Sequence, residues 1–370
     1  MTKRVCIVNP FQHGGGAEYQ ISCLIRHLSS TGQFEIFYLA RHIVEDMSTP
    51  GYSVVKIGNG SNVPRFGYMV DAIPLYKALK QIKPDVIYQR VGCAYTGIAA
   101  FYAKKHDIPM FWHVAHDTDV TPGNAFYGRN PIRRVLEKKA VEYGLRHATG
   151  IITQTASQAA LLHGNYGREC NETIPNFHPA PEEEIDKSGP LTVVWIANLK
   201  PWKRPEAFVR LAQSLSDLTE VQFVMVGAPP GGGGDAAWGE TLLADIEQTP
   251  NLTYRGQLQH DEVNALLATS HVFVNTSEAE GFPNTFIQSW LRGLPVASLS
   301  VDPDNILEQK QIGFDAKGDE ARLAEGVREL MTDHDKRHAA ADRAQAHAAE
   351  RHSMKNAARI EALLVSQENN

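Results

Sequence analysis

Short runs of branched apolar residues alternate along the chain with longer segments whose apolar residues recur at helical spacing. Runs of this kind are typical of buried parallel strands, and the segments between them of helices that cover a sheet, so the pattern predicts an α/β protein. The predicted strands of the first half are 5–8, 35–39, 53–57, 85–89, 110–113 and 150–153, with helices at 18–29, 73–81, 94–105 and 131–146. The second half has predicted strands at 191–196, 222–226, 252–255, 272–275 and 295–298.

The alternation is interrupted once, after Phe177, where prolines, glutamates and Ser188-Gly189-Pro190 break both periodicities. We therefore expect an N-terminal domain at 1–177, a linker at 178–190 and a C-terminal domain at 191–352. The stretch 320–365 is almost wholly helical in pattern, and Ser353 is a typical first residue for a separate last helix at 354–365. Two sheets joined by a linker predict a cleft.

Composition supports two folded domains and narrows the partners. The chain has 370 residues and is 43% hydrophobic, which is enough for two separate cores. Its net charge of −6 is dispersed, so no overall field attracts nucleic acid, and we predict no nucleic-acid partner. The four cysteines show neither a disulfide pattern nor zinc spacing, and the N-terminus lacks the pattern of a secretory signal. No stretch is apolar enough to span a bilayer, and we expect a cytoplasmic protein.

Ligands of parallel sheets bind beyond the carboxyl ends of the strands, so the loops there are the candidate sites. The first such loop, 9–16, ends in three contiguous glycines. Gly15 and Gly16 allow a ligand to approach the backbone, and the following helix N-terminus favours an anion or a hydroxylated group. The loop does not have the GxGxxG spacing, and a plain flexible turn is an open alternative.

The loop after the first strand of the second half, 198–205, places three cations in five residues. Lys200, Lys203 and Arg204 precede a helix whose first residue is Pro205, so the cations and the helix dipole are suited to a diphosphate. Taken alone, such a run is more often a solvated basic turn.

The loop 277–288 follows a strand and leads into a helix. The Glu280 carboxylate is suited to accept hydrogen bonds from sugar hydroxyls, and the amides near Asn284 and Thr285 are suited to an anion. Gln288 lies about one helical turn further on, within reach of a ribose hydroxyl. The alternative is that Glu280 caps the helix locally.

His116 follows the strand 110–113 and precedes a carboxylate. A histidine in this position is suited to bind a polar ligand or to move a proton near neutral pH, although a lone histidine is more often structural. Two acidic triplets, 117–119 and 302–304, have the DxD form that binds a divalent cation. Such triplets occur often by chance and no further ligands accompany them, so we predict no metal.

Taken in order, these loops resemble those of the retaining glycosyltransferases of family 4. The most specific part is Glu280-Gly281-Phe282-Pro283 through Gly293-Leu294-Pro295-Val296, and Ile174-Pro175-Asn176 is similar to the family's entry into the linker. The resemblance covers almost the whole chain. It implies the GT-B fold, which consists of two Rossmann-like domains that face each other across a cleft, with the last helix, 353–370, returning to the N-terminal domain.

The resemblance also implies the activity and its residues. A nucleotide-sugar donor would bind to Asn198, Lys203, Arg204, Glu280, Gly281, Phe282, Pro283, Asn284, Thr285 and Gln288. A glycan or lipid-linked acceptor would bind near Gly15, Gly16 and His116. Lys203, Glu280 and His116 would be catalytic, the anomeric configuration would be retained, and neither a metal nor another cofactor would be needed. The expected role is the synthesis of a cell-surface polysaccharide.

Two positions depart from the family pattern. Gln288 stands where the family usually has a second glutamate, and Asn198 stands where it has an arginine that binds the diphosphate. Losing that cation weakens stabilisation of the leaving group unless Lys200 or Arg204 replaces it. A nucleotide-sugar epimerase and a catalytically weak sugar-nucleotide-binding protein therefore stay open as alternatives. A nicotinamide-dependent oxidoreductase is disfavoured, because neither half has GxGxxG with the expected acidic residue.

The segment 129–147 has six basic side chains against two glutamates, with Ile132, Val135, Leu136 and Tyr143 at helical spacing. Such a helix is suited to lie on anionic lipid, which would bring the protein to the inner face of the membrane. A helix packed on the core with a basic outer face fits the pattern equally well.

Overall fold

The computed structural model of the protein describes residues 2–43, 51–58, 66–122, 130–230 and 236–366. The chain forms two compact units, one of Met1–Phe177 with Met354–Asn370 and one of His178–Ser353. It therefore passes from one unit to the other twice, after Phe177 and after Ser353.

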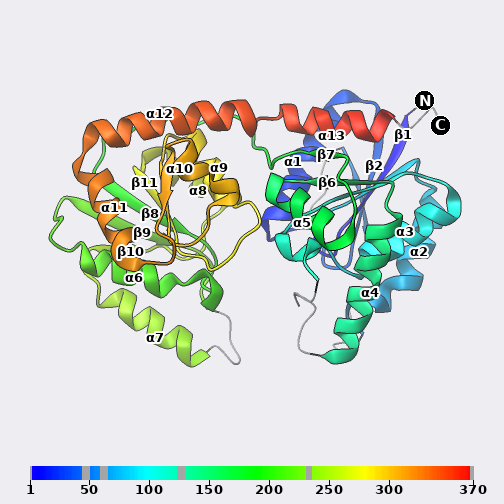
Figure 1. Ribbon diagram of the computed structural model, residues 1–370, viewed down its shortest axis with the longest axis horizontal. Helices are drawn as coiled ribbons and strands as arrows, with labels where there is room; N and C mark the ends of the chain where they lie inside the picture. The colour runs from blue at the N-terminus through cyan, green and yellow to red at the C-terminus, as the bar shows by residue number, and fades with distance from the viewer. Residues whose placement is uncertain (1, 44–50, 59–65, 123–129, 231–235, 367–370) are drawn as a thin grey trace. The chain divides into compact units, whose positions relative to one another are not determined.

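The first unit is built on a parallel sheet flanked by helices (Figure 1), and its strand order is β3-β2-β1-β4-β5-β6-β7. The strands are β1 (Lys3–Val8), β2 (Phe34–Ala40), β3 (Ser53–Lys56), β4 (Val86–Gln89), β5 (Met110–His113), β6 (Gly150–Thr153) and β7 (Glu172–Thr173). The helices are α1 (Gly16–Thr31), α2 (Ala72–Ile82), α3 (Ala94–His106), α4 (Pro131–His147), α5 (Ala156–Tyr166) and α13 (Lys355–Val365), with short 3₁₀ helices η1 (Gly67–Asp71) and η2 (Asp117–Val120).

Both faces of this sheet are covered, because successive strand residues alternate between two apolar cores. On one face Val5 and Ile7 pack with α1 and with α13, which contributes Ile360 and Leu364. On the other face Cys6 and Val8 pack with residues of α2, α3, α4 and α5. The last helix therefore belongs to the core of the unit that contains the N-terminus.

The second unit has a parallel sheet with strand order β10-β9-β8-β11-β12-β13. The strands are β8 (Leu191–Ile196), β9 (Val221–Val226), β10 (Leu252–Tyr254), β11 (Val272–Asn275), β12 (Val296–Ser298) and β13 (Gly313–Asp315). The helices are α6 (Pro205–Ser214), α7 (Ala236–Glu247), α8 (His260–Thr269), α9 (Asn284–Leu291), α10 (Ile306–Gln309), α11 (Glu320–Thr332) and α12 (His334–Arg351), with 3₁₀ helices η3 (Pro201–Lys203) and η4 (Pro303–Asn305). Helices α6, α7 and α11 cover one face, and α8, α9, α10 and α12 cover the other.

The predicted α/β fold with two parallel sheets is confirmed. Two short edge strands, β7 and β13, were not predicted, since their two and three residues give no readable pattern. The helical stretch after 320 breaks at Asp333. The Asp333 side chain accepts a hydrogen bond from the Lys336 amide and is the N-cap of α12. The prediction of a separate last helix is confirmed, but Ser353 is not its N-cap. Met354 is the N-cap of α13, and the buried Ser353 hydroxyl has no hydrogen-bond partner in the part of the chain that the structure describes.

None of the helices in the described part of the chain combines the length and the apolarity needed to cross a bilayer. All four cysteines are free thiols, and three of them are buried.

Candidate functional site

The strand order of the second unit reverses direction between β8 and β11, which are hydrogen-bonded neighbours. At such a switch point the loops leave in opposite directions and open a crevice beyond the carboxyl ends of the strands. The loop after β8 contains 198–204, and the loop after β11 contains 277–283. The two segments that the sequence indicated separately therefore leave the same point of one sheet.

Lys203 and Glu280 are in contact at this switch point. The Lys203 ammonium donates a hydrogen bond to Glu280 Oε1, and Ser277 Oγ donates to the same oxygen at 2.8 Å. The Lys203 ammonium also lies 4.0 Å from the centre of the Trp202 ring. Burial lowers the pKa of Lys203, and the negative charge of Glu280 opposes that shift. The site thus presents a cation and a carboxylate together in a partly buried position.

The two loops are fastened to each other below this pair. Thr276 Oγ1 donates to the carbonyl of Lys203 at 2.8 Å and to that of Arg204 at 2.9 Å, while it accepts from Trp195 Nε1 at 2.8 Å. The Glu278 amide donates to the Trp202 carbonyl at 3.0 Å. Because these bonds join backbone to backbone and to a buried side chain, the relative position of Lys203 and Glu280 is set before any ligand binds.

Asn198 lies exposed beside the loop after β9. Its Oδ1 accepts from the Ala228 amide at 3.4 Å, and the Leu199 amide donates to the Ala228 carbonyl at 3.0 Å. Gly227 makes this approach possible, since a Cβ there would lie 1.7 Å from the Ala197 carbonyl oxygen. The Asn198 amide is therefore partly used in joining the loops after β8 and β9.

The cations next to Lys203 have different environments. Arg204 Nη2 lies 2.7 Å from Glu320 Oε1, and Arg210 binds the same carboxylate at 2.7 Å. Lys200 is exposed, forms no ion pair within the described residues, and its charge contributes to lowering the pKa of Lys203. Of the two candidates to replace the missing arginine, Arg204 is thus already paired, and Lys200 is available to a ligand.

The segment 281–288 is mostly buried. The Phe282 ring packs against His352 and Trp290, with ring centres 4.8 Å and 6.1 Å away. Helix α9 begins at Asn284, and Asn284 and Thr285 are half-buried at its first turn. Phe282, together with the buried Gly281 and Pro283, therefore anchors the loop in the core and leaves the first turn of α9 at the surface.

Gln288 is directed toward α8. Its Nε2 lies 3.3 Å from Asn264 Oδ1 and 3.3 Å from His260 Nε2. Its side chain is nearly fully buried, and the Arg292 guanidinium donates to its backbone carbonyl at 3.0 Å. Two residues that the sequence did not single out, His260 and Asn264, thus determine the position of the Gln288 amide.

In the first unit, Gly15 is the N-cap of α1, and the helix start is occupied by a carboxylate of the chain itself. A Cβ on Gly15 would lie 2.4 Å from Glu18 Oε2, and Asn9 Nδ2 donates to Glu18 Oε1 at 2.8 Å. Burial raises the pKa of Glu18, whereas its bonds to Asn9 and to the amides of Glu18 and Gly15 act in the opposite direction. The loop of Gly15 and Gly16 therefore favours a neutral hydroxylated ligand over an anion.

His116 leaves the same edge of this sheet, after β5. Its Nδ1 accepts from the Thr118 amide at 3.2 Å, and the Asp119 carboxylate accepts from the amides of Ala115 and His116 at 3.0 and 3.1 Å. Burial raises the pKa of Asp119 to about 6. Gly15 and Gly16 follow β1, which β4 separates from β5, so the predicted acceptor residues share an edge but leave from strands two positions apart.

The acidic triplets take part in loop hydrogen bonds. Asp117 Oδ1 accepts from Gln158 Nε2 at 3.0 Å, and Asp302 Oδ1 accepts from the Leu307 amide at 2.9 Å. Within the described residues no three His, Cys, Asp or Glu side chains form a group that could hold a metal ion.

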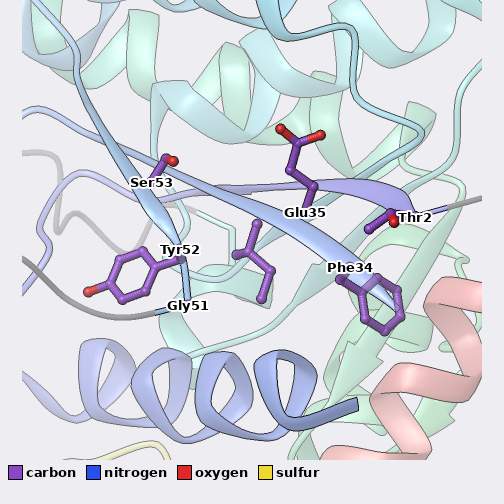
Figure 2. Close-up of a pocket in the computed structure, with 7 residues that line it drawn as sticks. Thr2, Phe34, Glu35, Gly51, Tyr52 and Ser53 are labelled. Carbon is purple, nitrogen blue, oxygen red and sulfur yellow. The ribbon is translucent and has the colours of Figure 1, made fainter. Parts of the chain in front are cut away.

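A hollow of about 580 Å³ lies in the first unit, at the edge of the sheet opposite to the carboxyl ends of the strands. Figure 2 shows that it is formed where β2 and β3 begin, and its lining residues are Thr2, Phe34, Glu35, Ile36, Gly51, Tyr52 and Ser53. Ligands of parallel sheets bind at the carboxyl ends of the strands. The hollow is at the amino ends and contains no predicted site residue, so we assign it no part in the site.

Several residues that shape the site had not been assigned from the sequence. Ser277 lies inside the segment 277–288, and its hydroxyl three residues before Glu280 indicates a candidate partner for that carboxylate. Thr276, Glu320, His260 and Asn264 gave no such signal, because their partners lie 24 to 116 residues away along the chain. Only the packed fold brings them to the site.

Comparison with known proteins agrees with this arrangement. Residues 14–179 match the family described as Glycosyltransferase Family 4, and residues 190–333 match the family described as Glycosyl transferases group 1. The two matches are separated by 180–189, just after the junction between the units, and they also leave out 1–13 and 334–370.

Two curated relatives align with the chain. It is 28% identical over 224 residues to 2-deoxystreptamine glucosyltransferase of Streptomyces kanamyceticus, covering 55% of this chain and 56% of that protein. It is 22% identical over 350 residues to a human subunit of phosphatidylinositol N-acetylglucosaminyltransferase, covering 83% of this chain and 65% of the relative. The chain thus spans less than two thirds of the length of either relative.

The structural likeness extends over both units. The crystal structure of Anabaena HepE in complex with UDP-glucose superposes with a TM-score of 0.77 at 18% identity, covering 98% of this chain and 99% of that one. At this identity the likeness establishes the fold alone. With one family match on each unit and this fold over nearly the whole length, the chain belongs to glycosyltransferase family 4, the group 1 glycosyltransferases, and has the GT-B fold.

Proposed function

We propose that the protein transfers a hexose from a nucleoside-diphosphate sugar to a hydroxyl of a glycan or lipid-linked glycan, with retention of the anomeric configuration. The observation that carries the proposal is the contact between Lys203 and Glu280 at the switch point of the second sheet. It provides a cation for the leaving diphosphate beside a carboxylate for the sugar hydroxyls. Family membership supports the same reaction.

The charges match the changes that occur during such a transfer. Negative charge grows on the diphosphate as the glycosidic bond breaks, so a preorganised cation contributes more in the transition state than in the ground state. An ammonium has three donors, so Lys203 is able to keep its bond to Glu280 while it donates to a phosphate oxygen. The departing phosphate accepts the proton of the acceptor hydroxyl, and His116 contacts the sugar or the acceptor near the reacting centre.

The remaining diphosphate charge is met by Lys200 and by the amides at the first turn of α9. Lys200 replaces the arginine that other members of the family have at the position of Asn198. The other nearby cation, Arg204, is already bound by Glu320. The reaction on this proposal needs no divalent metal, because these groups neutralise the diphosphate. Turnover measured with excess EDTA should equal turnover with added Mg²⁺, and a loss of activity in EDTA would contradict this part.

The acceptor would be presented at a membrane surface by α4. Ile132 and Val135 are 39% and 53% exposed, whereas the face of α4 that packs on the unit contains Val141 and Leu145. The exposed basic residues on the same helix are Arg134, Lys138, Lys139 and Arg146. Exposed apolar residues beside cations suit an anionic bilayer better than a core contact. Arg129, which belonged to the predicted segment, lies outside the described residues.

Vesicle binding tests the membrane contact. The protein should co-sediment with vesicles of 30% phosphatidylglycerol in phosphatidylcholine at low salt, and much less at 0.5 M salt or with pure phosphatidylcholine. Equal recovery in the pellet with and without the anionic lipid would contradict the contact. The human relative, by name part of a phosphatidylinositol N-acetylglucosaminyltransferase, makes a lipid-linked acceptor worth including.

A panel of nucleotide sugars tests the reaction itself. Thermal shift would identify the donor that stabilises the protein, and slow hydrolysis of that donor would show that the leaving group is activated. The anomeric configuration of the first product, read by NMR, should be that of the donor. Conversion of the donor to an epimer without an acceptor would instead indicate an epimerase, and donor binding without any turnover would indicate a binding protein.

A further inference from the structure

The carboxyl edge of the first sheet has an exposed pair of stacked aromatic rings. Phe11, in the loop after β1, is 40% exposed and stacks on His42, in the loop after β2, with ring centres 4.6 Å apart and planes inclined by 15°. His42 is exposed as well. Phe11 lies in the loop that leads to Gly15 and Gly16, so the pair occupies the edge where an acceptor is expected.

The rings sit on a backbone that is held in place. The Phe11 carbonyl accepts hydrogen bonds from Tyr38 OH at 2.6 Å and from Asn9 Nδ2 at 2.8 Å. The loops of Phe11 and His42 pair with each other, since the Gln12 amide donates to the His42 carbonyl at 2.9 Å and the His42 amide to the Pro10 carbonyl at 3.0 Å. An exposed phenylalanine on such a loop loses little entropy when a ligand covers it.

A third ring extends the pair on one side. Tyr68 meets Phe11 edge to face at 6.3 Å, and it is itself fixed because its amide donates to Glu137 Oε1 at 2.8 Å. Burial lowers the pKa of His42, and burial raises the pKa of Tyr68 to about 12. Near neutral pH the surface formed by Phe11, His42 and Tyr68, which we call the aromatic platform, is therefore uncharged.

A polar group in the same loop lacks a partner. The Nε2 atom of His13, two residues after Phe11, is buried and has no hydrogen-bond partner among the described residues. A buried polar atom without a partner costs free energy that a hydroxyl would recover. An apolar ring face and an unsatisfied nitrogen in one loop together suit a pyranose, whose C–H face is apolar and whose rim carries hydroxyls. An alkyl chain would leave the His13 nitrogen unsatisfied.

We propose that the aromatic platform binds the pyranose ring of the acceptor by stacking, with Phe11 as the main contact. This proposal rests on the proposed function, because it identifies the acceptor site of that reaction. Aromatic residues contribute strongly to binding when they are rigid and become buried by the ligand. Phe11 has no comparable role in the fold, since its ring lies outside the apolar cores.

Methyl glycosides test the platform directly. The α and β methyl glycosides of glucose, galactose and mannose would be titrated into the protein while the ring protons of His42 are followed by NMR. At least one glycoside should shift these signals saturably, and Phe11→Ala should weaken that binding tenfold or more, while Phe11→Tyr restores it. Phe101→Ala, which removes another exposed phenylalanine of the same unit, should bind as the parent does.

Enzyme kinetics separate this proposal from the proposed function. With the donor identified, Phe11→Ala should raise the KM for the acceptor tenfold or more and leave donor hydrolysis and the melting temperature unchanged. The proposed function would fail by the absence of donor turnover in the parent protein, an outcome that leaves the NMR titration in force. Unchanged acceptor KM in Phe11→Ala, or His42 shifts produced equally by octanol and by the glycosides, would overturn the platform.

Discussion

At the scale of single residues, the pairing of Lys203 with Glu280 is the strongest constraint on the chemistry. We expect Lys203→Ala to lower kcat with the preferred donor by well over tenfold, because one charge-assisted contact to the leaving diphosphate is lost. The measurement is turnover at saturating donor. Lys336→Ala is a matched control, since this lysine also pairs with a glutamate, Glu329, but lies at the surface of α12. Parent-like turnover in a folded Lys203→Ala protein would remove Lys203 from the mechanism.

Gln288 presents the second test at this scale. We expect Gln288→Glu to tighten donor binding severalfold, because an ionised acceptor forms a hydrogen bond to a ribose hydroxyl that is about 1 kcal/mol stronger than a neutral one. Calorimetric titration of the donor measures the change. Gln257→Glu, an exposed substitution of equal charge in the same unit, should leave the affinity unaltered. If donor affinity is the same in Gln288→Glu as in the parent, the amide does not contact the ribose.

At the scale of elements, the central strands could be predicted because burial on both faces leaves continuous apolar runs, as in β5 and β11. The loops 198–205 and 277–288 could be placed after their strands for the same reason. The side chains that these loops contact could not be predicted. Glu320 reaches Arg204 across 116 residues, and Gln288 turns toward α8, which depends on how two helices pack. Sequence periodicity contains no information on either contact.

Helix α4 shows the same limit. Its Glu137 is one of the two glutamates that the sequence sets against six basic side chains, yet its carboxylate is buried and caps α3. It accepts from the Ala94 amide, at the first residue of α3, at 2.5 Å and from the Tyr68 amide at 2.8 Å. The apolar spacing in 129–147 did not reveal this, because it fits a helix on lipid and a helix packed on the core equally well, and the two place different side chains inside.

We therefore expect Glu137→Gln to destabilise the protein by about 2 kcal/mol, since an amide replaces one acceptor oxygen with a donor and leaves a buried N–H without a partner. Urea unfolding measures the loss. Glu142→Gln, one turn further along the same helix, removes only surface pairs with Lys138 and Arg146 and should change stability by less than about 0.5 kcal/mol. Equal effects of the two substitutions would mean that the bonds of Glu137 contribute no net stability.

At the scale of the whole molecule, the two units share one plan, and that plan was accessible from the sequence. Each is a parallel sheet whose order reverses at one point, between β1 and β4 and between β8 and β11. Apolar runs reveal the strands in chain order, and the handedness of βαβ units then restricts their arrangement.

The second unit also buries histidines that stay neutral. Burial lowers the pKa of His178 to about 3 and that of His347 to about 4.

These histidines predict how the second unit responds to acid. Between about pH 6.5 and pH 4 the unfolded chain takes up a proton at His347 that the folded chain does not, so stability falls as the pH falls through this range. For His347 alone the loss between pH 7 and pH 5 is about 2 kcal/mol. We expect His347→Phe, which keeps an aromatic ring against Trp290, to reduce the loss by that amount.

Tryptophan fluorescence during urea unfolding at pH 7 and pH 5 measures this dependence in the right unit, because four of the five tryptophans lie in His178–Ser353. His338→Gln, at an exposed position of the same helix, should leave the pH dependence as it is in the parent. The His347→Phe protein would contradict this account if it lost as much stability between pH 7 and pH 5 as the parent. His347 would then take up its proton in the folded state, and the acid sensitivity would arise elsewhere. His178 would be the next residue to replace.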